Sequence, residues 1–307
     1  MRLIVVGLGT QGRKRRAVAG DDVVGTVDPV QPADYRTLGD VPVDTYDAAV
    51  VSTPDDVKLE LVTYLLGHGK HVLVEKPLLA PDAGSLEALA ALGRGRRAVC
   101  YTAYNHRFEP HFGRMKALLD SGDLGHVYRC RLFYGNGTAR DVRNSSWRDK
   151  GAGVLTDLGS HLLDTVLFWF GQRPWSFRVL SCHRFENAAF DDVVIGAEGE
   201  PVLELGMTLL SWRNHFTCDV VAERGSAHIE SLCKWGPSTF IHRWRTLPSG
   251  RPDEQSVTLV QPDPTWALEY EHFRRACALG EGNVANDVWI TERLNTLAAS
   301  ALAGARP

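Results

Sequence analysis

A glycine-rich turn near the start of the chain constrains the fold more than any other feature. Leu3 to Val6 is a continuous apolar, β-branched run, which is typical of a strand buried on both faces of a parallel sheet. Gly7-Leu8-Gly9-Thr10-Gln11-Gly12 follows at once, and Arg13 to Ala19 is compatible with a helix. The pattern G-x-G-x-x-G between a strand and a helix predicts the first unit of a doubly wound parallel sheet.

The turn also predicts a dinucleotide site. A second strand, Val23 to Val27, ends at Asp28, which lies 21 residues beyond Gly7. Glycines let backbone N–H groups approach a pyrophosphate at the helix N-terminus, and an acid at this spacing binds the adenosine ribose. The alternative is a bare strand–helix turn. The residues expected to hold the dinucleotide are Gly7, Gly9, Thr10, Gln11, Gly12 and Asp28.

Asp28 favours NAD over NADP as the cofactor. NADP adds a phosphate to the ribose hydroxyl that Asp28 should bind, and two unit charges about 4 Å apart repel by about 4 kcal/mol at an effective dielectric of 20. The next residues, Pro29 to Gln31, supply no cation. The run Arg13 to Arg16 is expected to be mostly a solvated basic face, although Arg13 or Lys14 could neutralise cofactor phosphate.

The alternation of strands and helices continues to about residue 105. Strands are expected at Ala48–Ser52, His71–Val74 and Ala98–Thr102, with helices at Asp55–Leu66 and Asp82–Leu92 between them. Ligands of such sheets bind beyond the carboxyl ends of the strands. The further cofactor contacts expected at these ends are Ser52, Thr53, Pro54, Glu75, Lys76 and Asn105.

The rest of the chain has a different pattern. Two helices, Glu109–Asp120 and Val154–Phe170, flank a strand at Val127–Tyr134 and a polar, glycine-rich loop at Asn136–Gly153. Seven strand-like runs follow in succession, which indicates a largely antiparallel sheet, and two helices close the chain.

The expected fold class is therefore α/β with two domains. Residues 1–105 form an N-terminal Rossmann domain with a doubly wound parallel sheet. Residues 106–307 form an α+β domain for substrate binding and oligomerisation, built on a large, mostly antiparallel open sheet. The C-terminal helices are free to pack back on the first domain.

One helix carries a possible acid–base pair. Asp157 and His161 are four residues apart in Val154–Phe170, so their side chains can touch. A carboxylate beside an imidazole favours the orientation and charge of a general base. Taken alone, this helix is explained better as an ordinary amphipathic helix with a hydrated face. Lys76 has a similar alternative, since a lysine after a buried strand can simply extend to water.

Together, these features resemble the GFO/IDH/MocA oxidoreductases, the family of glucose–fructose oxidoreductase and inositol dehydrogenase. The EKP triplet and the D-x-x-x-H pair, in this order, are the most specific part of the resemblance. The matching segments are GLGTQG at Gly7–Gly12, STP at Ser52–Pro54, GKHVLVEKPL at Gly69–Leu78, YNHRF at Tyr104–Phe108 and GAGVLTDLGSHLLDTVLFWFG at Gly151–Gly171.

The resemblance implies roles for three residues. His161 would take the hydroxyl proton, Lys76 would hydrogen-bond the same oxygen, and Asp157 would orient substrate and imidazole. The reaction would transfer a hydride between a secondary alcohol of a sugar, nucleotide sugar or cyclitol and the nicotinamide ring. One departure is Lys58, where many members have a histidine. We expect it on a helix near the cofactor edge, outside the chemistry.

Other functions use the same residues. The main alternative is a glycosidase that oxidises its sugar transiently with tightly held NAD, and another is a cofactor-binding sugar sensor without catalysis. A metal enzyme would need Asp157 and His161 with further ligands such as His106 and His111, and no such motif is present, so no metal is expected. Loop residues could line a substrate pocket, although a surface role explains them slightly better: Arg140, Arg143, Trp147, Arg148, Trp212, Arg213 and Asn214.

Composition excludes several classes of partner. The formal net charge of −3 gives no reason to expect nucleic acid or an anionic membrane. The longest apolar stretch, Leu162 to Phe170, is short and contains Asp164. We expect a cytoplasmic protein with reduced cysteines. An open sheet face should associate, so a homodimer or homotetramer is expected through strands between Val202 and Trp244.

Overall fold

A computed structural model describes residues 1–145 and 148–304. The chain forms two compact units. The first contains Met1–Asn105 and Thr265–Glu292, and the second contains His106–Pro264 and the chain from Arg293 on. The C-terminal helix α7 (Thr265–Leu279) thus belongs to the first unit, and α8 (Val284–Gly304) contributes to both.

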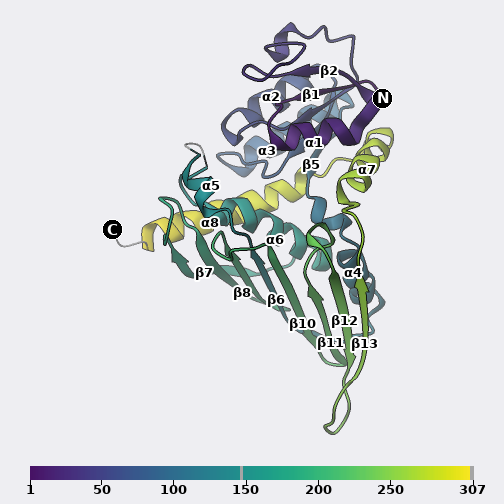
Figure 1. The fold of residues 1–307 in the computed structure, drawn as a ribbon, viewed down its shortest axis with the longest axis vertical. Coiled ribbons are helices and arrows are strands. Elements are labelled where there is room, and N and C mark those ends of the chain that lie inside the picture. Colours follow the sequence, from purple (N-terminus) through teal and green to yellow (C-terminus); the bar gives the residue numbers. More distant parts are fainter. Residues whose placement is uncertain (146–147, 305–307) are drawn as a thin grey trace. The chain divides into compact units, whose positions relative to one another are not determined.

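The first unit contains a five-stranded parallel sheet with the strand order β2-β1-β3-β4-β5 (Figure 1). The order reverses between β1 and β3, and ligands of such sheets bind at this switch point. The elements are β1 (Leu3–Val6), α1 (Thr10–Ala19), β2 (Val23–Val27), β3 (Ala48–Val51), α2 (Asp55–Gly67), β4 (His71–Glu75), α3 (Ala83–Arg96) and β5 (Cys100–Ala103).

Helices cover both faces of this sheet. On one face, Val62 and Leu65 of α2 and Leu86 of α3 pack against alternate strand residues such as Ile4 and Val72. The other face packs against α7 through Tyr270 and Phe273. Burial on both faces explains why these strands are continuous apolar runs instead of alternating ones.

The second unit contains an eight-stranded sheet with the order β13-β12-β11-β10-β6-β9-β8-β7 (Figure 1). All pairs are antiparallel except β6 with β9. The elements are α4 (Pro110–Ser121), β6 (Val127–Gly135), α5 (Ala139–Arg143), α6 (Val154–Phe170), β7 (Ser176–His183), β8 (Asp192–Glu198), β9 (Val202–Thr208), β10 (His215–Ala222), β11 (Gly225–Glu230), β12 (Ser238–Trp244) and β13 (Asp253–Leu259).

The predicted fold class is confirmed, and the structure differs from prediction in detail. The loop expected at Asn136–Gly153 contains the short helix α5. Helix α6 packs against β6, β8 and β9 on one face of the large sheet. The other face exposes Val202 and Val221, but it is not a broad apolar surface, since it also carries ion pairs such as Arg131–Glu204. Among the described residues, no helix combines the length and apolar character needed to cross a membrane.

Candidate functional site

The glycine turn after β1 has the shape of a phosphate cradle. Gly7 has a φ of +89°, and a Cβ there would lie 2.6 Å from the carbonyl oxygen of Ser52. A Cβ at Gly12 would lie 1.7 Å from the carbonyl oxygen of Gly7, so both positions require glycine. At Gly9, by contrast, a Cβ would meet nothing within 4 Å. The turn therefore leaves no room for a side chain at Gly7 or Gly12, whereas the space beside Gly9 is open.

The start of α1 leaves its backbone donors available to an anion. Gly9 is the N-cap residue and supplies no side-chain cap, and the first turn contains no acidic residue. Backbone N–H groups at a helix N-terminus then remain for an anionic ligand, with the helix dipole favouring negative charge. Ser52 donates its N–H to the carbonyl oxygen of Val6 at 2.8 Å, which fixes the end of β3 beside this turn. These residues fit the pyrophosphate of a dinucleotide.

Asp28 is buried and already accepts three backbone hydrogen bonds. One carboxylate oxygen accepts from the N–H of Leu8 at 2.7 Å, and the other accepts from Val30 at 2.8 Å and Gln31 at 2.7 Å. Burial raises the pKa of this carboxyl, but the three N–H donors outweigh it and leave the pKa below its usual value. Asp28 is therefore a fixed negative charge beside the glycine turn.

Sequence reasoning missed a cation at this turn. Arg36 lies eight residues after Asp28, and its Nη1 donates to the carbonyl oxygen of Gln31 at 3.1 Å. Its charge also lowers the pKa of Asp28. Pro29 to Gln31 themselves supply no cation, but the chain folds back and brings Arg36 to this turn.

The basic run of α1 divides into exposed and buried members. Arg13, Lys14 and Arg16 are exposed, as expected of a solvated face. Arg15 is the exception: it is 2% exposed and forms ion pairs with Glu75 at 2.6 Å and Glu269 at 2.7 Å. The carboxylate of Glu75, predicted to contact cofactor, thus has a partner that ties the end of β4 to α1.

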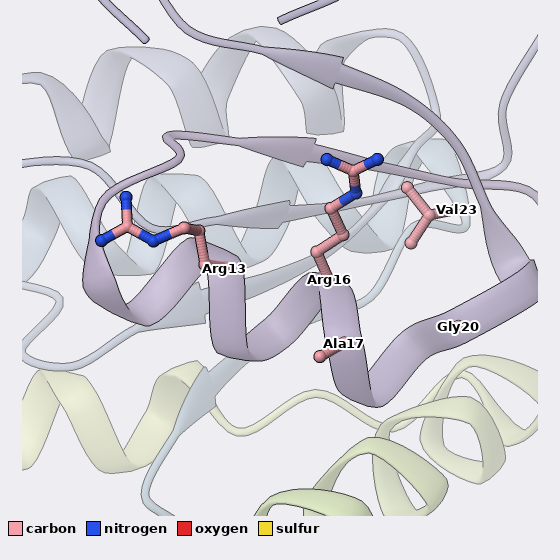
Figure 2. A pocket seen from close by; sticks show the side chains of 5 residues that line it. All are labelled: Arg13, Arg16, Ala17, Gly20 and Val23. Atoms are coloured by element: carbon pink, nitrogen blue, oxygen red, sulfur yellow. The ribbon is translucent and has the colours of Figure 1, made fainter. Parts of the chain in front are cut away.

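Two members of this run border a surface hollow. Figure 2 shows the Arg13 and Arg16 side chains on the same side of α1, with Arg16 beside Val23. The hollow has a volume of about 370 Å³. Arg13 also donates from Nη1 to the carbonyl oxygen of Leu8 at 2.8 Å, which brings its charge to the glycine turn.

Lys58 contacts the turn that carries Lys76. Its ammonium is buried and donates to the carboxylate of Asp55 at 2.6 Å and to the carbonyl oxygens of Lys76 at 3.3 Å and Pro77 at 3.2 Å. Lys58 therefore connects the start of α2 to the segment after β4. Lys58, which replaces the usual histidine, thus stabilises the backbone of the predicted catalytic residue Lys76.

The other predicted contacts lie at strand ends of the first unit. Thr53 follows β3, and Pro54 is the N-cap residue of α2. Asn105 follows β5, is buried, and donates from its side-chain amide to the hydroxyl of Thr265 at 3.0 Å. Thr265 begins α7, so Asn105 joins the end of β5 to the C-terminal part of this unit.

Asp157 and His161 lie one turn apart on α6 of the second unit. His161 is buried. Asp157 is more exposed, and one of its oxygens accepts from Nη2 of Arg148 at 3.3 Å. Arg148, predicted as a pocket-lining residue, therefore lies beside the predicted catalytic carboxylate.

Asp164, on the same helix, is 1% exposed. It accepts two bonds from Nε of Arg107, at 2.8 and 3.1 Å, and one from Nη2 at 2.6 Å. Burial raises the pKa of Asp164, and the Arg107 guanidinium opposes that rise only in part. This pair binds the short 3₁₀ helix η3 (Asn105–Phe108) to α6.

The sequence did not reveal what surrounds His161. The ring of His106 stacks on that of His161 with centroids 4.0 Å apart and an interplanar angle of 15°. Nζ of Lys234, in the short 3₁₀ helix η4 (Cys233–Trp235), lies 3.3 Å from Nε2 of His106. Neither residue has a sequence signal for this role, because the three elements are far apart in the chain.

Two of the remaining loop residues have described surroundings of their own. Arg143 donates to the carbonyl oxygen of Glu186 at 3.3 Å, and Trp212 is 97% exposed with a φ of +59°. Trp147 lies outside the described residues. His111, weighed as a metal ligand, is hydrogen-bonded to the carbonyl oxygen of Ser238 at 3.1 Å. Across residues 1–145 and 148–304, no three His, Cys, Asp or Glu side chains are grouped as a metal site.

Comparison with known families decides the identity of the chain. Residues 5–104 match the family model described as oxidoreductase family, NAD-binding Rossmann fold, and residues 112–228 match the GFO/IDH/MocA C-terminal domain. The chain belongs to the GFO/IDH/MocA oxidoreductase family. Its first unit is accordingly an NAD-binding Rossmann domain, as the glycine turn and Asp28 predicted.

Curated relatives of this GFO/IDH/MocA protein match part of its length. Inositol 2-dehydrogenase 1 of Saccharopolyspora erythraea is 41% identical over 127 residues, which are 40% of this chain and 35% of that protein. An uncharacterized oxidoreductase of Schizosaccharomyces pombe is 33% identical over 148 residues, or 45% of this chain and 37% of that protein. The matched segment spans about a third of the length of these relatives.

Solved structures share the fold over nearly the whole chain. Levoglucosan dehydrogenase in complex with NADH has a TM-score of 0.83 and 17% identity, covering 98% of this chain and 96% of that one. An inositol dehydrogenase homologue from Azotobacter vinelandii, complexed with NADH and myo-inositol, has a TM-score of 0.77 and 18% identity, covering 99% and 96%. At this identity the likeness shows the fold alone.

Proposed function

We propose that this protein is an NAD-dependent dehydrogenase or reductase that interconverts a secondary alcohol and a ketone on a sugar, nucleotide sugar or cyclitol. The observation that carries the proposal is the buried imidazole of His161, one helical turn from Asp157, in a chain of this family. Relatives named for inositol and solved relatives named for levoglucosan support the substrate class.

When bound, NAD supplies a nicotinamide ring that accepts or returns a hydride. The glycine turn and the first turn of α1 would bind its pyrophosphate, and Asp28 would bind the adenosine ribose. The fixed negative charge of Asp28 disfavours a phosphate on that ribose, which is why we propose NAD as the preferred cofactor.

In the proposed reaction, His161 is the general base for the substrate hydroxyl. A neutral imidazole takes the proton as the C–O bond becomes a carbonyl, and returns it in the reverse direction. Lys76 donates a hydrogen bond to the same oxygen and stabilises the negative charge that develops on it. Lys58 supports this role through its bonds to the carbonyl oxygens of Lys76 and Pro77.

Asp157 completes the proposed group. Its carboxylate would accept a hydrogen bond from a second substrate hydroxyl or from the His161 ring, and so orient either of them. The Arg148 guanidinium, 3.3 Å away, would hold one oxygen of this carboxylate in place.

Two substitutions test the proposal. Lys76→Met keeps the aliphatic stem and removes the donor, which should lower turnover by about 10²–10³-fold. His161→Ala should lower it at least as much and abolish the acidic limb of the pH profile. Both variants should retain the wild-type circular dichroism spectrum. Near-normal turnover in both would refute the assignment.

The substrate class is tested by screening sugars, nucleotide sugars and cyclitols for NADH absorbance. A dehydrogenase accumulates NADH in proportion to ketone formed. Release of a sugar from a glycoside without net NADH would instead identify the NAD-dependent glycosidase, which uses the same side chains.

A further inference from the structure

The surroundings of His161 contain a lysine and a second histidine to which neither the sequence nor the proposed reaction gives a role. His106 is 1% exposed and lies face to face with His161. The ring of Tyr134 closes one side, with centroids 5.2 Å from His106 and 5.9 Å from His161. Two stacked imidazoles cannot both take a proton easily, because two like charges about 4 Å apart repel by about 4 kcal/mol at an effective dielectric of 20.

Contacts to neighbouring elements fix both His106 and Lys234. The bidentate pair Arg107–Asp164 binds η3 to α6, and this determines where the adjacent His106 ring meets His161. Glu109 is buried, and its carboxylate accepts the backbone N–H of Cys233 at 3.0 Å. That bond holds the residue before Lys234. The stack and the lysine are therefore parts of one supported arrangement.

The side-chain nitrogen of Lys234 lies beside two aromatic rings. Its Nζ lies 4.8 Å from the ring centre of Trp235 and 5.8 Å from that of Tyr134, as in cation–π contacts. Burial lowers the pKa of Lys234 below its usual value, and Glu109, Asp263 and Cys233 oppose that fall only in part. An ammonium has no acceptor, so in its contact with His106 it donates to Nε2.

This donation determines the state of His106. With Nε2 used as an acceptor, the one proton of a neutral His106 lies on Nδ1, and a second proton at Nε2 would meet the ammonium 3.3 Å away. His161 therefore rests on a neutral ring. Because the Lys234 charge lies beside His106, a proton on His161 meets less electrostatic repulsion than one on His106.

We propose that Lys234, acting through His106, is a positioning residue that keeps His161 neutral at rest and makes it the proton acceptor of the stacked pair. This inference rests on the proposed role of His161 as the base. The other charged and titratable groups around the two rings are Asp157 and Asp164, each paired with an arginine, together with Glu109, Tyr134, Cys233 and Asp263.

The experiment is an NMR titration of the histidine side chains, which needs neither cofactor nor turnover. The chain has 11 histidines, so the signals of His106 and His161 are assigned with His106→Asn and His161→Asn. In the unmodified protein at neutral pH, His106 should be neutral with its proton on Nδ1. A proton on Nε2 would overturn the proposal without any change to Lys234.

Lys234→Met should then raise the titration midpoint of the histidine pair by about one pH unit or more, because a like charge beside His106 has been removed. Lys234→Arg keeps the charge and should restore the lower midpoint. Lys116→Met, which removes an exposed lysine paired with Asp120 on α4, should leave it unchanged. A midpoint in Lys234→Met equal to that of the unmodified protein would overturn the proposal.

Turnover supplies the second readout. In Lys234→Met the acidic limb of kcat/KM should move to higher pH, with most of the rate recovered above the new midpoint. If His161→Ala abolishes turnover while Lys234→Met leaves both profiles unchanged, the positioning role fails and the base assignment stands. If His161→Ala keeps full turnover but Lys234→Met still shifts the NMR midpoint, the proposed function fails. The positioning role of Lys234 then stands.

Discussion

Removing Arg107 should destabilise α6, and more so at neutral than at acidic pH. Asp164 is 1% exposed, and the three bonds from Arg107 at 2.6 to 3.1 Å are the contacts that compensate its burial. Breaking a buried pair by deleting one partner costs about 3–5 kcal/mol. We expect about 3 kcal/mol for Arg107→Met at pH 7, because the Arg107 side chain keeps 21% of its surface exposed.

The pH dependence follows from the direction of the pKa shift. Burial already raises the pKa of Asp164, and loss of Arg107 removes the groups that oppose this rise. Between the unfolded pKa of about 3.9 and the raised folded pKa, the folded state binds more protons, so its stability falls as pH increases. Each pH unit in that window is worth about 1.4 kcal/mol, so the loss at pH 5 should be clearly smaller than the loss at pH 7.

Hydrogen exchange of α6 peptides at pH 7 and pH 5, corrected for intrinsic rates, measures this opening free energy. Arg2→Met is the matched control, because it breaks an exposed pair with Asp47 that should contribute no more than about 1 kcal/mol. A loss in Arg107→Met below about 1 kcal/mol at both pH values, or a larger loss at pH 5, would refute the reasoning.

Three further outcomes are expected. Titration calorimetry should show at least about tenfold tighter binding of NAD than of NADP, and Asp28→Ser should narrow this gap; equal binding by the unmodified protein would mean that Arg36 and the α1 arginines control the pocket. Lys58→Met should lower turnover about tenfold with little change in NAD affinity, since it releases the carbonyl oxygens of Lys76 and Pro77; unchanged turnover would remove Lys58 from the site. Light scattering should show a homodimer or homotetramer that Val221→Lys, on the exposed sheet face, weakens; a micromolar monomer would contradict this.

The sequence alone determined the features that depend on local pattern. Strands buried on both faces of a parallel sheet are apolar runs in the sequence, so the first sheet could be predicted. The glycine spacing between a strand and a helix likewise predicted a dinucleotide-binding turn. The D-x-x-x-H spacing likewise put Asp157 and His161 on one helix, because a helix repeats every 3.6 residues.

Only the tertiary structure decided which side chains meet across distant segments. It assigned α7 to the first unit, paired β6 in parallel with β9, and buried Arg15 between two carboxylates. It also brought His106 and Lys234 to His161. The sequence around a residue shows its polarity and the spacing of the apolar residues near it. Whether a charge is solvated or compensated depends on partners that the folded chain brings from tens of residues away.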